Sequence, residues 1–504
     1  MIQAAITVAL ALTGCGHPVA AGTEAPIGAV EAAKATARGL DGWRDEIIYF
    51  ILTDRFSNGD RANDFNVNTK DPNAYHGGDF QGIINKLPYI KGLGATTIWI
   101  TPINDNKDDA LIGKYWGYHG YWTKNWEGVD EHLGSEAKFK ELVTAAHALG
   151  MKVMLDMVVN HMGYDAAWAK DDAHKDWFHR NGDVKNWDDM WQVQNCDISG
   201  LPDMNTESPE VIKYMEDMWA GWINRTHVDA FRMDTVKHVP IKFWSQFNRN
   251  IHGRAPKDFL MLGEMLHGDP GALGPYTKEG DFDSLFDFPM YFTINDVFAR
   301  GQSMRKLGDR LQQDGAYQDA TMLSPFLDNH DMPRFMSVAN KDERRLRLAL
   351  AFLMSMRGIP TMYQGTEIGQ DGQSEADNRR DMAFGANPAL TTYVSKLMHL
   401  RQDLAPLRRG KQLEMWQDDQ VYGYSRLDGS NEAIVLLNND DQAQTRDVPL
   451  RAESKLPDGT VLTDMLNGGT VTVANHHVRV ALGAKQARIF AVQAGRKQAP
   501  KKRD

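Results

Sequence analysis

The sequence predicts an α/β protein whose main body is a parallel (β/α)8 barrel, the TIM-barrel architecture, followed by an antiparallel β domain. Three observations lead to this fold class. Eight short apolar runs alternate with helix-like patterns, as in a parallel barrel. The polar, Trp- and Asp-rich stretch 161–205 is too long for an ordinary loop after the third run. Beyond about Arg409, short β-rich runs are separated by Asp-Gly and Gly-Gly turns.

The elements follow in chain order. The expected barrel strands are 47–52, 96–100, 152–157, 228–233, 259–263, 283–288, 321–327 and 359–363. The expected strands of the C-terminal domain are 422–426, 433–437, 471–473 and 478–481. These runs divide the chain into a barrel (41–160 and 206–408), an insertion (161–205), a C-terminal β-sandwich domain (409–494) and a basic tail (495–504).

The N-terminus has the pattern of an export signal. Residues 2–12 are apolar and end at Leu12-Thr13-Gly14-Cys15, which resembles the lipobox of bacterial lipoproteins, although no basic residue precedes the run. Residues 1–14 would then be removed, Cys15 would carry a lipid, and 15–40 would form a flexible tether. An unlipidated secretory leader is the alternative. Either reading predicts an exported protein, held at the cell envelope (the outer membrane if one is present) or released to the periplasm or medium.

Composition excludes several classes of function. Of the 504 residues 42% are hydrophobic and 24% charged, which is typical of a water-soluble globular protein. The net charge of −11 argues against nucleic acid as a partner. The only other cysteine is Cys196, so acylation of Cys15 would leave no partner for an intramolecular disulfide.

Four short segments carry the chemistry. They are Asp156-Met-Val-Val-Asn-His161, Phe231-Arg-Met-Asp234 running on to Lys237-His238, Leu262-Gly-Glu264, and Phe326-Leu-Asp-Asn-His-Asp331. Each follows an apolar run, so three acids stand at the ends of three different strands, where barrels of this kind carry their catalytic groups. Two carboxyl groups facing each other across a glycosidic bond are what acetal hydrolysis requires. In order and spacing, the four segments resemble those of the α-amylase family (glycoside hydrolase family 13), the retaining α-glucan hydrolases and transferases.

The resemblance implies a role for each acid. Asp234 would be the nucleophile, and Glu264 the general acid and base, which requires a raised pKa. Asp331 would bind sugar hydroxyls and help to keep Glu264 protonated. The resemblance also places a small inserted domain at 161–205.

A set of further residues would bind the sugar. Arg232 lies two residues before Asp234 and so shares its strand face, where its charge would hold that acid ionised. By resemblance, histidines 161 and 330 would donate hydrogen bonds to the sugar and Tyr121 would stack beneath it. The remaining contacts would come from Lys237, His238 and Arg379. Taken singly, several of these have structural readings, for example an Arg232–Asp234 ion pair or a turn capped by His161.

Two calcium sites are also implied. Calcium takes six to eight oxygen ligands, and two oxygen-rich segments resemble the N-terminal calcium site of cyclodextrin glycosyltransferases and maltogenic amylases. The matching positions are Asn58, Asp60, Asn63, Asp64, the carbonyl of Gly77, and Asp79. A second structural calcium would be held by Asn160, Asp203 and the carbonyl of His238. An ordinary Asx-rich loop is the alternative reading of the first segment.

Hydrolysis is favoured over transfer. Cyclising transferases carry a large aromatic residue just after the acid/base and another near the middle of the groove, where this chain has Met265-Leu266 and about Ser199. The expected function is therefore monomeric, endo-acting hydrolysis of α-1,4 bonds in starch, glycogen or maltodextrins through a covalent glycosyl-enzyme. The alternatives are a transglycosylating or cyclodextrin- or pullulan-degrading enzyme, and a glucan-binding protein without activity.

Overall fold

The computed structural model describes residues 38–492 of the chain. The predicted leader, Cys15, most of the predicted tether and the basic tail lie outside the described residues. Within the described part, no helix combines the length and the apolar character that crossing a membrane would require.

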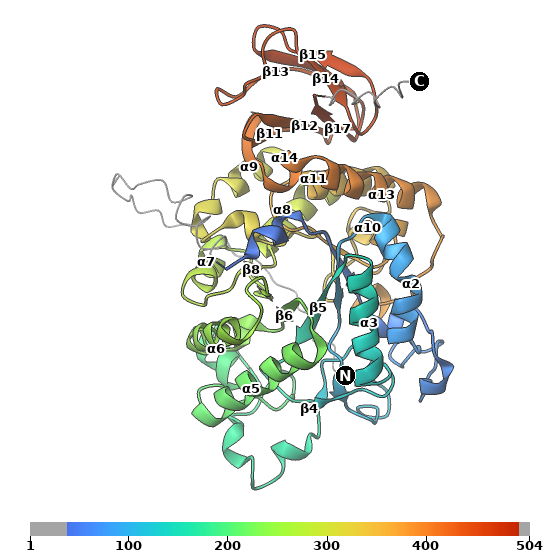
Figure 1. The fold of residues 1–504 in the computed structure, drawn as a ribbon, viewed down its shortest axis with the longest axis vertical. Helices are drawn as coiled ribbons and strands as arrows, with labels where there is room; N and C mark the ends of the chain where they lie inside the picture. The colour runs from blue at the N-terminus through green and yellow to red at the C-terminus, as the bar shows by residue number, and fades with distance from the viewer. Residues whose placement is uncertain (1–37, 493–504) are drawn as a thin grey trace, which may run out of the picture.

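A curled parallel sheet surrounded by helices forms the main body (Figure 1). Its strand order is β8-β7-β6-β5-β2-β1-β9. The strands are β1 (Ile48–Ile51), β2 (Thr97–Ile100), β5 (Lys152–Met157), β6 (Ala230–Met233), β7 (Leu260–Gly263), β8 (Ser284–Leu285) and β9 (Thr361–Tyr363). The main covering helices are α2 (Phe80–Leu93), α3 (Glu136–Ala148), α5 (Pro209–Thr226), α6 (Ile241–Arg254), α7 (Pro270–Lys278), α8 (Phe288–Ile294), α11 (Glu343–Ser355) and α13 (Pro388–Asp403). The predicted barrel fold is confirmed.

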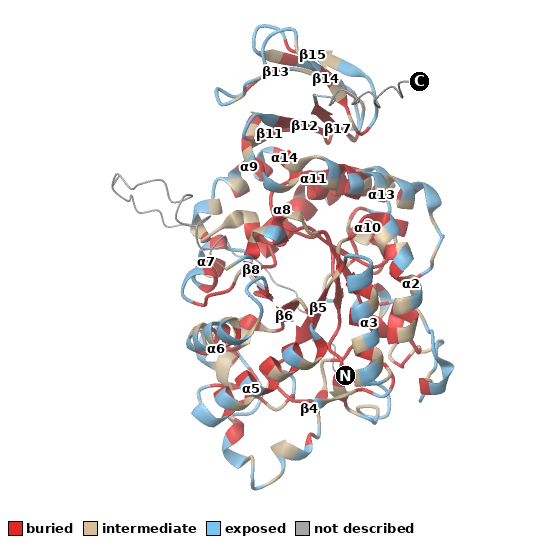
Figure 2. Ribbon diagram, in the orientation of Figure 1, coloured by how far each residue is buried: buried red, intermediate tan, exposed pale blue. Residues whose placement is uncertain are grey.

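The strands are buried on both faces, which explains their continuous apolar runs. Alternate residues of β1 belong to different cores: Ile48 and Phe50 pack inside the ring, whereas Tyr49 and Ile51 pack against the helices. Figure 2 shows the same division, with buried residues lining the ring and exposed ones on the outer faces of the helices.

Helix starts follow local capping chemistry. The side chain of Asp79 accepts from the amide of Gly82 at the start of α2, and Ser135 accepts from Lys138 at the start of α3. Gly94 ends α2 in a left-handed conformation.

The prediction of a seventh strand at 321–327 is wrong. This segment begins with a 3-10 turn, Ala320–Met322, and pairs through a single parallel bridge at Ser324. Pro325 has no N–H to donate to a ladder, which limits regular pairing. Nevertheless Ser324 donates to the carbonyl of Leu285 at 2.9 Å and Pro325 accepts from Thr361 at 2.9 Å. The segment therefore fills the place between β8 and β9 and completes the ring.

The insertion between β5 and α5 has little regular structure. It contains 3-10 turns, isolated bridges and the short helix α4 (Met190–Asn195), around a small core of Val184, Val193 and Cys196. A second small feature, the hairpin of β3 (Asn104–Asn106) and β4 (Thr123–Val129), projects from the segment after β2. Cys196 is buried in that core, as a packing residue would be.

The C-terminal domain packs against the side of the barrel where α11 and α13 lie (Figure 1). Its antiparallel sheets have the orders β10-β11-β12-β17-β14-β15 and β13-β16, and side chains from both pack in one core. The strands are β10 (Lys411–Gln417), β11 (Val421–Asp428), β12 (Asn431–Asn438), β13 (Gln444–Pro449), β14 (Val461–Asp464), β15 (Thr470–Thr472), β16 (His477–Leu482) and β17 (Gln486–Ala491). The antiparallel β domain is confirmed, although only four of its strands were predicted. The short helices α9 (Arg305–Leu311), α10 (Phe335–Val338), α12 (Glu375–Asn378) and α14 (Ala405–Arg409) complete the fold.

Candidate active site

Two of the predicted acids stand at the carboxyl ends of neighbouring strands. Asp234 follows β6 directly and Glu264 follows β7 directly. Their amides continue the parallel ladder: Asp234 donates to the carbonyl of Met157 at 3.0 Å, and Glu264 donates to that of Met233 at 2.8 Å. The strand register therefore determines the backbone positions from which both side chains extend.

Arg232 joins three carboxyl groups. Its fully buried guanidinium places Nη1 2.6 Å from Oδ1 of Asp234 and 2.9 Å from Oδ1 of Asp156. Its Nη2 lies 2.9 Å from Oε1 of Glu264, as an ion pair without the direction of a good hydrogen bond. Because both Asp234 and Glu264 contact one guanidinium, the two carboxyl groups are held close together on the barrel rim.

Glu264 is the group most affected by this environment. Burial raises the pKa of Glu264 to about 8, the charge of Arg232 opposes the rise, and the neighbouring Asp234 and Asp331 add to it. The amide of Thr235 donates to its Oε2 at 3.1 Å. At neutral pH the carboxyl group therefore keeps its proton, as a general acid must.

Asp331 lies in the loop that follows the irregular segment between β8 and β9, which includes Ser324 and Pro325. Its Oδ1 is 2.9 Å from Nη2 of Arg379 and its Oδ2 is 3.3 Å from Nε2 of His330. Arg379 also donates to the carbonyl of His330 at 2.9 Å. Arg379, predicted to contact the sugar, thus lies beside the third acid and holds its loop.

Tyr121 and the two histidines line the same rim. The rings of Tyr121 and His330 are nearly parallel, with centroids 5.3 Å apart. Nε2 of His161 lies 3.2 Å from the carbonyl of Tyr121. Burial lowers the pKa of His161 and, with the charge of Arg379, lowers that of His330. Both rings are therefore neutral at neutral pH and offer hydrogen bonds without a charge.

The Lys237-His238 pair faces the insertion. Both residues lie in the 3-10 turn Val236–His238, and Nδ1 of His238 is 3.0 Å from the carbonyl of Val193. Burial lowers the pKa of His238 to about 4. The half-exposed Trp187 ring lies nearly perpendicular to the ring of His238, with centroids 5.9 Å apart. The pair thus lies where the insertion meets the barrel.

Sequence reasoning assigned no role to Asp156, although the first motif begins with it. The structure brings this acid into the cluster through Arg232. The available signal was an acidic residue within a strand that is otherwise buried and apolar apart from its first residue, Lys152. A charge in such a position persists only when it is paired.

The first predicted calcium site fits only in part. Nδ2 of Asn58 donates to Oδ1 of Asp64 at 2.7 Å, and both atoms lie so close to Gly77, which has a positive φ of 89°, that a Cβ there would be only 2.6 Å from each. The Oδ1 of Asn63 is buried without a hydrogen-bond partner, as expected for an oxygen that can bind a cation. The carboxylate of Asp79, however, already accepts from backbone amides with both oxygens.

Asp60 also has a local use in this segment. Its Oδ1 accepts from the amide of Ala62 at 3.0 Å and caps a 3-10 turn. Asp60 and Asp79 therefore stabilise the backbone of the segment, whereas the oxygens of Asn58, Asn63, Asp64 and Gly77 are the better candidates for direct ligands.

The second predicted site fits better. Asn160 and Asp203 are both 1% exposed, and the amide of Met204 donates to the carbonyl of Asn160 at 2.8 Å. Oδ2 of Asp203 lies 2.6 Å from Nδ1 of His179, while its Oδ1 is buried with no partner. An unpaired buried carboxylate oxygen is an expected ligand for a hard cation.

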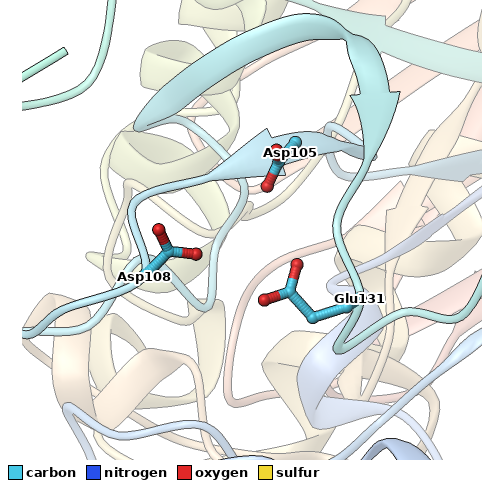
Figure 3. A group of neighbouring side chains, drawn as sticks. All are labelled: Asp105, Asp108 and Glu131. Atoms are coloured by element: carbon cyan, nitrogen blue, oxygen red, sulfur yellow. The ribbon is translucent and has the colours of Figure 1, made fainter. Parts of the chain in front are cut away.

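One acidic cluster was not predicted. Asp105, Asp108 and Glu131 point toward a common space (Figure 3), with oxygens within 4.8 Å of one another. Lys124 lies against both aspartates, with its Nζ 3.1 Å from Asp105. The cluster could hold a metal ion, although the lysine already balances part of its negative charge.

A carboxyl group with a raised pKa beside a second acid, both at strand ends of a barrel, is the arrangement that glycoside hydrolases use. The alpha-amylase catalytic-domain family matches residues 50–446. The chain is 43% identical to a β/α-amylase of Paenibacillus polymyxa over 468 residues, which cover 89% of this chain and 38% of that protein's length. Cyclomaltodextrin glucanotransferases and cyclomaltodextrinases match at lower identity.

Solved structures agree with the sequence comparison. An Anoxybacillus α-amylase superposes with a TM-score of 0.84 at 41% identity, covering 89% of this chain and 98% of that one. An α-amylase of Geobacillus thermoleovorans, solved in complex with acarbose, superposes with a TM-score of 0.83 at 37% identity, covering 90% and 99%. The chain belongs to the alpha-amylase family.

Proposed function

We propose that this chain is an endo-acting α-amylase that cleaves α-1,4-glucosidic bonds of starch, glycogen or maltodextrins with retention of configuration. The observation that carries the proposal is the contact of Asp234 and Glu264 with the single guanidinium of Arg232. This sharing keeps the carboxyl groups close, which favours the retaining spacing of roughly 5–5.5 Å over the wider inverting one.

The chemistry follows from the protonation states. Asp234, paired with Arg232, attacks the anomeric carbon, while protonated Glu264 gives its proton to the departing glycosidic oxygen. Glu264 is then a carboxylate and takes a proton from the incoming water, which releases the sugar from Asp234. Neutral His161 and His330, with Asp331, hydrogen-bond the hydroxyl groups of that sugar, and Tyr121 supplies the stacking surface beneath it.

The test is a chromatographic time course of products from amylose. We expect linear oligosaccharides of mixed length at early times. Cyclic products, or long chains grown from short ones, would instead support the second candidate, a transglycosylating enzyme such as the more distant cyclomaltodextrin glucanotransferases. Absence of any product, with calcium supplied, would contradict cleavage of amylose and point either to a glucan-binding protein or to another substrate, such as cyclodextrin or pullulan.

Calcium is proposed as a structural ion, held by Asn160, Asp203 and the carbonyl of His238, and by the oxygens around Gly77. When bound, it would supply positive charge and no catalytic step. These residues tie the loop carrying His161 to the insertion, through the amide of Met204 and the carbonyl of Asn160. A cation at this junction would therefore stabilise the rim of the site.

Removal of calcium is expected to lower the thermal midpoint by a few degrees, because a ligand at about 100 times its Kd contributes about 2.7 kcal/mol. The measurement is thermal unfolding after EDTA treatment, with calcium and magnesium added back separately. Calcium alone should restore the midpoint. Asp203→Asn should lose most of this response, and an unchanged midpoint in EDTA would contradict both sites.

A further inference from the structure

Asp156 is the one charged residue of the first motif that the proposed reaction does not use. It is the fifth residue of β5, the strand next to β6, and its side chain is fully buried. In register, Asp156 pairs with Arg232 across the two strands. A buried carboxylate is costly unless it is paired and hydrogen-bonded.

Three different elements converge on this carboxyl group. Its Oδ1 accepts from Nη1 of Arg232 at 2.9 Å. Its Oδ2 accepts from the hydroxyl of Tyr121 at 2.7 Å and from the indole Nε1 of Trp99 at 3.0 Å. Burial raises the pKa of Asp156 to about 7, while the charge of Arg232 and the Tyr121 hydrogen bond oppose the rise. All three contacts are donors, so they favour the carboxylate form, which can accept from each of them.

The same partners touch the reacting groups. Arg232 contacts Asp234 and Glu264, and the ring of Tyr121 stacks beside His330. Nη1 of Arg232 is shared between Asp156 and Asp234, so the position of the guanidinium depends on both acids. Nη1 of Arg232 also donates to the hydroxyl oxygen of Tyr121 at 3.4 Å, so Asp156, Arg232 and Tyr121 all contact one another.

We propose that Asp156 is a positioning residue of the reaction: by pairing with Arg232 it makes the guanidinium's charge common to Asp156, Asp234 and Glu264, and by accepting from the Tyr121 hydroxyl it orients that ring. Without the negative charge of Asp156, the positive charge of Arg232 would be balanced by Asp234 and Glu264 alone. The proton of Glu264 would then be lost more readily, because a nearby positive charge favours the carboxylate.

The charged and titratable groups that face this network come from several elements. Around Asp156 and Glu264 these are Arg232 and Asp234 from β6 and its end, Tyr121 from the loop before β4, Asp331 from the loop after the irregular segment between β8 and β9, and His161 from the end of β5. Arg379, which pairs with Asp331, and the ring of His330 lie at the same rim. Arg232 is the cation that contacts Asp156, Asp234 and Glu264, so a change in its position affects all three.

The test is Asp156→Asn, measured as kcat and KM on maltoheptaose across the pH range. An amide cannot accept from all three donors, so the guanidinium should shift. We expect kcat to fall about 100-fold, as for a small misplacement of catalytic groups, with KM little changed. The alkaline limb, at which activity is lost as Glu264 deprotonates, should move about one pH unit lower.

A matched control separates positioning from stability. Asp287 is equally buried and pairs with Nη1 of Arg357 at 2.7 Å. It does not contact Asp234, Glu264 or Asp331. Asp287→Asn should lower the thermal midpoint comparably but leave the alkaline limb in place. The proposal is overturned if Asp156→Asn keeps the parent's limb, or if Asp287→Asn moves the limb as far.

A second variant keeps the test decisive should Asp156→Asn fail to fold. Asp156→Glu retains the charge but displaces it by one methylene. We expect a large fall in kcat and an alkaline limb within about half a pH unit of the parent's, since the charge remains. Parent-like kcat in this variant would overturn the proposal.

The inference rests on the proposed function, since it assumes Glu264 as the acid. Glu264→Gln distinguishes the two. Full activity of Glu264→Gln would remove the proposed function itself. An inactive Glu264→Gln together with an unshifted Asp156→Asn would remove only the positioning role of Asp156.

Discussion

Replacing Asp234 with Asn is expected to abolish hydrolysis of starch, with kcat reduced by about 10⁴-fold or more, because an amide cannot form the covalent intermediate. Replacing Glu264 with Gln should cost about 10²–10⁴-fold, the usual contribution of a general acid and base. Both variants preserve side-chain size, and both should unfold at nearly the parental temperature.

The two variants should respond differently to the leaving group. An aryl maltoside with a good leaving group needs little protonation, so its cleavage by Glu264→Gln should be impaired much less than that of starch. Asp234→Asn should be impaired equally on both substrates, because the nucleophile is needed in either case. The measurement is kcat on the two substrates. Equal impairment of Glu264→Gln on both would contradict its role as the acid.

Replacing Arg232 with Lys is expected to have the next largest effect, a fall in kcat of at least about 10³-fold with a lower thermal midpoint. A lysine presents a point charge and cannot contact three carboxyl groups as the planar guanidinium does. Leaving buried acids unpaired costs about 3–5 kcal/mol. Kinetics and thermal unfolding of the purified variant measure the two effects.

Arg401 supplies the control for this substitution. It is fully buried as well, but its guanidinium donates to the carbonyls of Met354, Met356 and Gly358, away from the acids. Arg401→Lys should reduce stability and leave kcat close to that of the parent. If Arg232→Lys behaves like Arg401→Lys, the guanidinium is structural and the proposed sharing of its charge is wrong.

Much of the site was predictable because it depends on local order along the chain. Asp234 and Glu264 each follow an apolar run directly, and parallel strands bring their carboxyl ends to one rim. The expectation that Arg232 shares a face with Asp234 needed only the alternation of side chains in a strand. Asp156 obeys the same alternation, but no local rule indicates that its partners come from three separate elements.

The metal segments illustrate the opposite case. Asp79 and Asp60 match a ligand pattern in sequence, yet their oxygens accept from backbone amides that only the folded loop brings near. The unpaired Oδ1 of Asp203 has no sequence signature at all. Similarly, Pro325 lies in an apolar run that was predicted as a strand, and the folded segment pairs with its neighbours only at isolated points.

The sequence by itself determined the barrel class, the succession of its strands along the chain apart from the irregular segment between β8 and β9, and the three acids that follow apolar runs. These features depend on short-range periodicity and spacing. Tertiary structure decided which carboxyl groups share Arg232, which oxygens remain free for a cation, and why Glu264 keeps its proton. Those properties depend on burial and on distances between residues from different strands, and a raised pKa exists only once water has been excluded.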